Sequence, residues 1–501
     1  MDNYDERTIS SYNTKPVYGQ QNNFQGNAGI TYSLIIIDNT RNIRIEELHK
    51  EQISIGRSAD ICISSSIVSR THGVFTKIRN QYYYEDCGSL NGTLYNNIQV
   101  QPTRGQPSQK ILLKDGDVLK IDTNTNISES VLIIFSTQPV ARSKWQYINL
   151  CNLREPLLIG RAVPDNHLQL EGLQISRLHA KIFLRNGRFI IQDANSMNGI
   201  IINGRHCNRE YTLSEKDVIC IGSTKLIFSG GFLVFNKAPN GIKVDVRDIS
   251  RVVKGNKTIL SHVSLTIEPS SLVAIIGGSG AGKSTFMNCI NGFEPATSGQ
   301  VFMNDLDLYQ NYNYLKSGIG YVPQKDELHD FLTVKDALTF TANLRLTNDV
   351  QSYEIKPRIQ QVLKIMDLTE HQNTMIKKLS GGQKKRVSIA MELVSDPDIF
   401  FLDEPTSGLD PETETALMKQ LKYLSANIGK TIVVITHTLQ NIHLFDKIVF
   451  LAPGGKLCYY GSPKEATSFF GVETLPEAYE KIKGNIDYFV SKYSNSVREV
   501  F

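Results

Sequence analysis

The stretch that most constrains the fold of this chain of 501 residues is GGSGAGKST, at residues 277–285. It continues the apolar run LVAIIG and leads into a segment compatible with a helix that begins at Lys283. A strand, a glycine-rich loop and a helix in this order form a phosphate-binding loop, because backbone N–H groups surround the phosphates and the helix N-terminus points at them. Further strands and helices alternate after it (DIFFLD, a helix from about Pro411, and TIVVITH). This part of the chain is therefore predicted to be an α/β domain with a largely parallel, buried sheet.

The phosphate-binding loop predicts a nucleotide site, and the residues in and near it can be given specific roles. Lys283 is expected to reach the β and γ phosphates, and the Ser284 hydroxyl to contact Mg²⁺. The strand DIFFLD ends in Asp403, which suits a magnesium contact, and the adjacent Glu404 can act as the general base that polarises the attacking water. The residues predicted to bind the nucleotide here are Gly277, Gly278, Ser279, Gly280, Ala281, Gly282, Lys283, Ser284 and Thr285.

The stretch LSGGQKKRVSIAMELVSDP, residues 379–397, resembles the signature motif of ABC ATPases. Other motifs stand in that family's order: Gln324 in GYVPQ, SGLD ending at Asp410, and His437 in TIVVITH. The resemblance implies that Glu404, His437, Gln324 and Lys283 are catalytic, that Gln324 also contacts the metal, and that ATP and Mg²⁺ are the cofactors. It further implies nucleotide contacts by Ser380, Gly381, Gly382, Gln383 and Asp410. In that family two such domains enclose two ATP molecules, so a homodimer or heterodimer is implied.

The first half of the chain repeats one motif. Ser69, His72 and Asn91 recur as Ser176, His179 and Asn198, each 107 positions later, and a Gly-Arg pair precedes each set at 56–57 and 160–161. A period of this length indicates domain duplication. The short β-rich runs between glycines and asparagines are typical of an antiparallel sandwich, and the same order of runs recurs in the second copy.

Each repeat combines two arginines, a serine and an asparagine on predicted loop tips, a set suited to a phosphate group and its peptide. The set resembles the forkhead-associated (FHA) domain, a β-sandwich that binds phosphothreonine peptides. By this resemblance the contacts are made by Arg57, Ser69, Arg70 and Asn91 in one copy and by Arg161, Ser176, Arg177 and Asn198 in the other. His72 and His179 are expected to be structural. The N-terminal tail offers one ligand, phosphorylated Thr14; a phosphothreonine protein is the alternative.

The predicted fold class is therefore multidomain: two all-β FHA sandwiches followed by an α/β P-loop ABC ATPase with a helical subdomain. The predicted boundaries are a disordered tail at 1–30, FHA domains at 31–139 and 143–235, a linker at 236–241, the ATPase at 242–472 and a connecting helix region at 473–501.

The segment YVPQKDELHDFLTVKDALTFTANLRL resembles the G subfamily of ABC transporters, which implies ATP-driven transport. No apolar run is long enough to span a bilayer, so the expected partner is a separate or missing transmembrane domain, and the expected location is the cytoplasmic face of the membrane. A soluble, FHA-targeted ATPase of ribosome or DNA maintenance is the alternative. A net charge of +4 gives no argument for nucleic acid, and only 97 positions separate Lys283 from Ser380, too few for a long coiled coil. A phosphopeptide adaptor with an incidental ATPase is less consistent with the full set of motifs.

Overall fold

The computed structural model describes residues 32–38, 43–78, 81–95, 98–101, 105–114, 117–122, 130–137, 145–150, 155–165, 167–207, 209–214, 217–229, 231–236, 241–325, 327–346 and 349–498. The predicted tail, with Thr14, and most of the predicted linker lie outside these residues.

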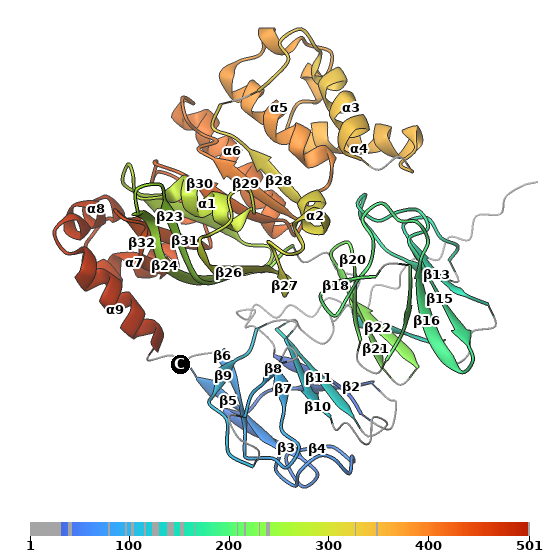
Figure 1. Ribbon diagram of the computed structural model, residues 1–501. Helices are drawn as coiled ribbons and strands as arrows, with labels where there is room; N and C mark the ends of the chain where they lie inside the picture. The colour runs from blue at the N-terminus through green and yellow to red at the C-terminus, as the bar shows by residue number, and fades with distance from the viewer. Residues whose placement is uncertain are drawn as a thin grey trace, which may run out of the picture.

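The first FHA domain is a sandwich of two sheets, as predicted (Figure 1). Aromatic side chains of both sheets fill its core: Phe75, Tyr82, Tyr84 and Phe135 are all buried. One sheet has the order β2-β1-β11-β10-β7-β8 and the other β4-β3-β5-β6-β9. The strands are β1(Ser33–Ile37), β2(Ile43–Glu47), β3(Gln52–Gly56), β4(Ile61–Cys62), β5(Gly73–Ile78), β6(Gln81–Asp86), β7(Leu94–Tyr95), β8(Ile98–Gln99), β9(Ile111–Leu112), β10(Val118–Ile121) and β11(Val131–Ser136).

The second FHA domain repeats this plan with one change. Its sheets have the orders β12-β22-β21-β20-β17-β18 and β14-β13-β15-β16-β19, so β13 to β21 match β3 to β11. The place of β1, however, is taken by β22, which follows β21 in a hairpin. The strands are β12(Trp145–Asn149), β13(Leu157–Gly160), β14(Leu168–Gln169), β15(Ala180–Arg185), β16(Arg188–Asp193), β17(Ile201–Ile202), β18(Arg205–His206), β19(Glu210–Thr212), β20(Val218–Ile221), β21(Thr224–Ser229) and β22(Phe232–Asn236). The expected recurrence of the β-rich runs holds, because β13, β15, β16, β20 and β21 follow the order of β3, β5, β6, β10 and β11; the change lies only at the position of β1.

The ATPase domain is built on a ten-stranded sheet of order β27-β26-β23-β24-β32-β31-β25-β30-β29-β28. The prediction of a largely parallel sheet holds for the buried centre, where β31, β25, β30, β29 and β28 run parallel. The other half is mainly an antiparallel arm. The strands are β23(Val244–Val253), β24(Lys257–Ile267), β25(Leu272–Gly277), β26(Ser298–Met303), β27(Leu306–Asp307), β28(Ile319–Val322), β29(Ile399–Asp403), β30(Thr431–Ile435), β31(Lys447–Ala452) and β32(Lys456–Gly461).

Helices cover this sheet and form a separate lobe. Helices α3, α4 and α5 lie together at the top of Figure 1 and form the helical subdomain. The helices are α1(Lys283–Ile290), α2(Tyr312–Leu315), α3(Val334–Arg345), α4(Ser352–Ile365), α5(Gly381–Val394), α6(Pro411–Ala426), α7(Pro463–Phe470), α8(Leu475–Lys483) and α9(Ile486–Arg498), with 3-10 turns at Lys316–Gly318, Thr369–His371, Ile376–Lys378 and Ile442–Leu444.

The C-terminal region differs from the expected connecting helix. It forms two helices, α8 and α9, separated at Gly484, and Leu475, Ile482 and Phe489 are buried in the core of the ATPase domain. These helices therefore belong to the packed domain. Among the described residues, no helix combines the length and the apolar composition that crossing a membrane requires.

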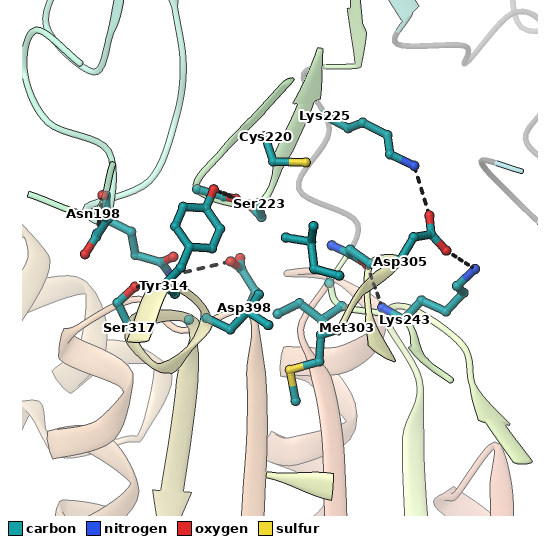
Figure 2. A pocket seen from close by; sticks show the side chains of 18 of the residues that line it. Asn198, Cys220, Ser223, Lys225, Lys243, Met303, Asp305, Tyr314, Ser317 and Asp398 are labelled. Atoms are coloured by element: carbon teal, nitrogen blue, oxygen red, sulfur yellow. Dashed lines mark hydrogen bonds and ion pairs between the residues drawn. The ribbon is translucent and has the colours of Figure 1, made fainter. Parts of the chain in front are cut away.

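The three domains meet at a chain of ion pairs. Asp305 of the ATPase domain pairs with Lys225 of the second FHA domain at 2.9 Å and with Lys243 at 3.0 Å, as Figure 2 shows. Lys243 also lies 3.7 Å from Asp117 of the first FHA domain. Burial opposes charge on Asp305, but Lys225 and Lys243 hold the pKa of its carboxyl well below the usual range. The domains are thus joined by specific contacts, which nothing in the sequence pattern indicated.

Candidate functional site

The loop predicted to bind phosphate lies at the carboxyl end of β25 and leads into α1. Gly282, which precedes α1, has a φ of 86°, a conformation that favours glycine. The Lys283 amino group donates to the carbonyl oxygens of Gly277 and Gly278, each at 3.0 Å. Burial lowers the pKa of Lys283, while Glu404 and Asp403 raise it. The Lys283 amino group is therefore held by the backbone of its own loop, in the space where a phosphate would bind.

Three predicted catalytic side chains meet beside this loop. Gln324 follows β28, Glu404 follows β29 and His437 follows β30, so all three lie at the carboxyl edge of adjacent parallel strands. The Glu404 carboxylate accepts a hydrogen bond from the Gln324 amide at 2.8 Å and lies 2.5 Å from His437 Nε2. Glu404 itself has a φ of 45°, in the left-handed region. A non-glycine residue held in that region is a constraint of the kind that functional sites carry.

Asp403 and Ser284 adjoin this group. Burial and the neighbouring Glu404 raise the pKa of Asp403, while a hydrogen bond with the Ser284 side chain lowers it. Two oxygen donors, one from β29 and one from α1, thus face each other where the sequence predicts the metal. Carboxylate and hydroxyl oxygens are ligands that Mg²⁺ accepts.

The signature residues lie away from the phosphate-binding loop of the same chain. Ser380 caps α5: its hydroxyl accepts from the backbone N–H of Gln383 at 3.3 Å, and the Gln383 side chain accepts from the Ser380 N–H at 3.0 Å. A Cβ on Gly381 would meet no atom within 4 Å, so this end of the helix is open. Among the described residues, no hydrogen bond joins these residues to the loop at 277–285.

Asp410, the other residue expected to contact nucleotide, caps α6. Its carboxylate accepts from the backbone N–H of Thr413 at 2.9 Å, and this contact lowers the pKa of Asp410. Gly382 packs closely against α6, because a Cβ there would lie 2.4 Å from a methyl carbon of Thr413. Asp410 and the signature helix α5 are therefore held together, on the side of the domain that carries Ser380.

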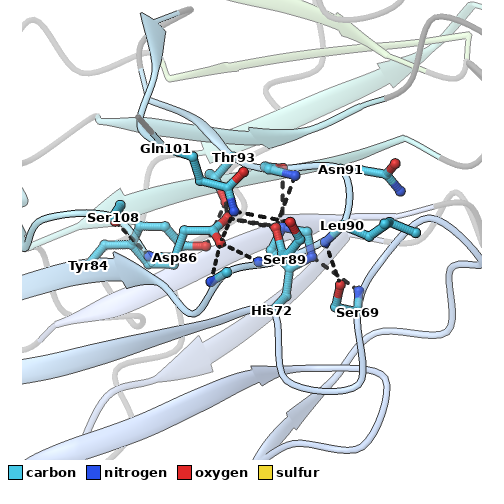
Figure 3. Close-up of polar contacts among 12 residues, drawn as sticks. Ser69, His72, Tyr84, Asp86, Ser89, Leu90, Asn91, Thr93, Gln101 and Ser108 are labelled. Atoms are coloured by element: carbon cyan, nitrogen blue, oxygen red, sulfur yellow. Dashed lines mark hydrogen bonds and ion pairs between the residues drawn. The ribbon is translucent and has the colours of Figure 1, made fainter. Parts of the chain in front are cut away.

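The loops of the first FHA domain are held by a buried polar network (Figure 3). His72 is fully buried, accepts from the Ser69 N–H at 3.1 Å and lies 3.2 Å from the Gly92 carbonyl oxygen. The Ser69 hydroxyl accepts from the Leu90 N–H at 3.1 Å. The Asn91 amide donates to the carbonyl of Ile67 at 2.7 Å. His72 thus joins two loops from below, as expected for a structural histidine, and Ser69 ends at the loop surface.

The second FHA domain repeats these contacts. His179 accepts from the Ser176 N–H at 3.1 Å and lies 2.9 Å from the Gly199 carbonyl oxygen. The Ser176 hydroxyl accepts from the Met197 N–H at 3.1 Å, and the Asn198 side-chain amide donates to the backbone carbonyl of Gln174 at 2.7 Å. Burial lowers the pKa of both His72 and His179, which keeps the rings neutral. With Nδ1 accepting, the proton lies on Nε2 and is donated to the carbonyl.

The two copies differ in what surrounds their arginines. Arg57 and Arg70 are exposed, whereas Arg161 is only 8% exposed and lies against α4 of the helical subdomain. Its guanidinium pairs with Glu354 and lies 3.6 Å from Asp349. Arg177 contacts Asp349, Tyr353 and Glu354. Sequence reasoning missed Asp349, Tyr353 and Glu354, since acids at or just before the start of a helix are ordinary and nothing in the spacing of these residues points to a distant loop.

The geometry defines a class of protein: a P-loop ATPase of the ABC type, with the signature helix on a separate lobe, preceded by two FHA sandwiches. Comparison with known families agrees. The ABC transporter family model matches residues 260–407, and the FHA domain model matches residues 53–122 and 157–222. The chain belongs to the family of ABC transporter ATP-binding proteins.

Relatives share different portions of the chain. It is 36% identical to the ABC transporter ATP-binding/permease protein Rv1747 of Mycobacterium tuberculosis, over 67% of this chain and 39% of that protein. It is 37% identical to ABC transporter G family member 22 of Arabidopsis thaliana, over 46% of this chain and 31% of that protein. It is 34% identical to the methionine import ATP-binding protein MetN of Corynebacterium diphtheriae, over 46% of this chain and 68% of that protein. The chain thus spans well under half the length of the first two relatives.

Proposed function

We propose that this chain hydrolyses ATP to drive transport across a membrane, as the nucleotide-binding part of an ABC transporter, and that its FHA domains bind phosphothreonine peptides. The meeting of Gln324, Glu404 and His437 beside the phosphate-binding loop is the observation that carries the ATPase proposal. Relatives named as transporters support the transport proposal.

In the proposed reaction Glu404 accepts the proton of the water that attacks the γ-phosphate. His437, 2.5 Å away, and Gln324 hold this carboxylate in place. Lys283 leaves the carbonyl groups of its own loop and binds the phosphates instead. The reaction converts ATP and one water molecule into ADP and phosphate.

Magnesium fits the oxygen donors present. Ser284, Gln324 and Asp403 would hold it, since the Ser284 hydroxyl and the Asp403 carboxylate already face each other. When bound, the ion neutralises charge on the phosphate oxygens.

A second subunit completes the proposed site. The open N-terminus of α5, with Ser380, Gly381, Gly382 and Gln383, suits the γ-phosphate of ATP bound to a partner copy. Two such domains arranged head to tail would enclose two nucleotides. The proposed location is the cytoplasmic face of a membrane, on a transmembrane partner domain.

For the FHA domains, exposed Arg57 and Arg70 beside the Ser69 hydroxyl and Asn91 suit a phosphate group and the peptide that carries it. Arg161, Ser176, Arg177 and Asn198 form the equivalent set in the second copy. A phosphothreonine protein, or phosphorylated Thr14 of the tail, is the proposed ligand.

Purification from native membranes in mild detergent, followed by an ATP turnover assay, tests the proposal. We expect a transmembrane protein to co-purify with the chain and ATP turnover to depend on Glu404. Glu404→Gln retains the shape of the side chain but removes the base, so turnover should fall by about 100-fold or more while ATP binding remains.

Two results would contradict the proposal separately. Turnover by Glu404→Gln equal to that of the wild type would rule out Glu404 as the base. Recovery of the chain only from the cytosol, together with ribosomes or nucleic acid, would replace transport with a soluble role.

A further inference from the structure

The second FHA domain already holds an anion in the place where its loops would hold a phosphate. Asp349 accepts a hydrogen bond from the backbone N–H of Arg177 at 2.6 Å and lies 3.6 Å from the Arg161 guanidinium. Glu354 pairs with Arg161 and lies 3.7 Å from Arg177. Tyr353 adds a hydroxyl contact and a ring, whose centre lies 5.7 Å from the Arg177 guanidinium. Both arginines of the set therefore bind one short acidic segment of the same chain.

The first FHA domain is the internal comparison. It has the same loops and the same internal hydrogen bonds, and its Arg57 and Arg70 are exposed. Within the described part of the chain, neither of these guanidiniums pairs with a carboxylate. Arg161 differs in two ways: its Nε donates to the Ile175 carbonyl of its own domain at 3.0 Å, and the segment that precedes and begins α4 is docked on its guanidinium. The docked segment thus contributes to the burial of Arg161, while the serine, histidine and asparagine contacts of the two copies match.

The docked segment resembles a phosphorylated ligand in charge. Two carboxylates carry about the same charge as a phosphothreonine, −1.5 to −2, and offer several acceptor oxygens. Glu354 is also held in place, because its carboxylate accepts from the Gln351 N–H at 3.0 Å and so caps α4. The acidic segment is thus presented by a rigid helix end, which reduces the entropy lost on docking.

We propose that the second FHA domain is occupied by the segment Asp349–Glu354 of its own ATPase domain, and that a phosphothreonine peptide binds this copy only by displacing that segment. The proposal rests on the proposed phosphopeptide function. It assigns the two copies different states: the first is open to a ligand and the second is closed by an internal competitor.

Competition between the two ligands follows from shared partners. Arg161 and the backbone N–H of Arg177 cannot serve Asp349 and a phosphate at the same time. An arginine left buried without its carboxylates is unfavourable, so displacement requires a peptide that supplies equivalent charge. By linkage, a bound phosphopeptide in turn weakens the contact between the second FHA domain and the segment at 349–354 of the helical subdomain.

The test uses the full chain and a degenerate phosphothreonine peptide library, with the unphosphorylated library as the blank. Arg57→Ala silences the first copy, so that capture reports the second copy alone. On this background Asp349→Asn with Glu354→Gln removes both charges of the internal ligand and keeps side-chain size. The matched control, Asp336→Asn with Glu370→Gln, removes two exposed acids from the same subdomain: Asp336 in the first turn of α3 and Glu370 in the first turn of a 3-10 helix.

We expect the Asp349→Asn, Glu354→Gln variant to capture phosphopeptide about 5- to 150-fold more tightly, the usual range of coupling between sites. Hydrogen exchange of residues 172–178 should rise in the same variant and remain at the wild-type level in the control. Equal capture in both variants, or unchanged exchange, would overturn the proposal.

Binding by the first FHA domain distinguishes failure of the internal-competitor proposal from failure of the proposed phosphopeptide function. An Arg161→Ala chain leaves only the first copy to bind the library. If this chain binds and the acid-to-amide variant gains nothing, the internal competitor is refuted while phosphopeptide binding stands. If neither copy binds in any variant, the phosphopeptide function and the inference that rests on it both fall.

Discussion

At the scale of single residues, the buried histidines explain why each repeat carries its SRxH motif. His72 and His179 each join the serine loop to the asparagine loop through one accepted and one donated hydrogen bond. A protonated ring could not accept, so the motif depends on a neutral imidazole. Burial lowers the pKa of both rings and so favours this form.

This dependence predicts a loss of stability in acid. The folded pKa of His179 lies below its usual value, so below about pH 6.5 the unfolded chain binds more protons than the folded one and the free energy of unfolding falls. We expect a slope of at most about 1.4 kcal/mol per pH unit from this group. Denaturation followed by the fluorescence of Trp145, the single tryptophan, measures it in the second FHA domain.

His179→Gln should weaken this slope, because glutamine does not titrate. The control is His49→Gln, since His49 is well exposed in the first copy. The same slope in both variants would mean that another group governs the acid response.

The sequence predicted more about the individual site residues than about the contacts between domains. Lys283, Gln324, Asp403, Glu404 and His437 gather as expected, because motifs at the ends of parallel strands must meet at one sheet edge. The partners of Arg161 could not be predicted, because contacts between domains depend on the relative orientation of the domains, which leaves no periodicity in the sequence.

At the scale of elements, the glycine of each Gly-Arg pair permits a close approach between a strand end and the serine loop. A Cβ on Gly56 would lie 2.2 Å from the Arg70 carbonyl oxygen, and one on Gly160 would lie 2.3 Å from that of Arg177. Arg57 and Arg161 come next in the chain and are held in place, because their backbone N–H groups donate to the carbonyl oxygens of Ser69 and Ser176. The sequence showed the Gly-Arg pair, but not that steric closeness is its reason.

Gly160→Ala is therefore expected to destabilise the second FHA domain by about 1–3 kcal/mol, the usual cost of forcing atoms into a packed region. The transition monitored by Trp145 fluorescence should move to lower temperature. Gly56→Ala creates the same collision in the other copy and should shift this transition less. A Gly160→Ala protein with an unchanged transition would contradict the steric explanation.

The sequence could not predict that β22 occupies in the second copy the sheet position that β1 occupies in the first. Both strands are apolar and have five residues; β1 pairs antiparallel with β11, and β22 pairs antiparallel with β21, the equivalent strand of the second copy. The hydrophobic pattern identifies such strands, but it does not say whether the start or the end of the domain's sequence supplies this position in the sheet. β22 ends at Asn236 and β23, the first strand of the ATPase domain, begins at Val244, so the second sandwich is completed by the strand that precedes the ATPase domain in the chain.

At the scale of the whole molecule, Asp305 is the carboxylate shared by Lys225 of the second FHA domain and by Lys243, which also approaches Asp117 of the first. Asp305→Asn leaves Lys225 and Lys243 without their shared partner and should weaken the contact by about 1–3 kcal/mol. The folded pKa of Asp305 lies below its usual value, so its contribution is complete above about pH 4 and is lost as pH falls further.

Small-angle scattering measures this change as an increase in the radius of gyration. Asp165→Asn is a control, because Asp165 is an exposed acid of the second FHA domain. A radius that stays the same in Asp305→Asn, at neutral and at acidic pH, would show that the other contacts, among them Arg161 with Glu354 and Lys243 with Asp117, hold the domains without Asp305.

The second FHA domain touches both lobes of the ATPase. The hydroxyl of Tyr314, beside the central sheet, donates to Gly222 at 3.0 Å, while Arg161 and Arg177 hold the end of α4 on the helical lobe. A domain that is attached to both lobes opposes a rotation of one lobe against the other, as a brace does. The second FHA domain contains neither the phosphate-binding loop nor the signature helix, yet its contacts with both lobes are expected to restrain the angle between these two elements.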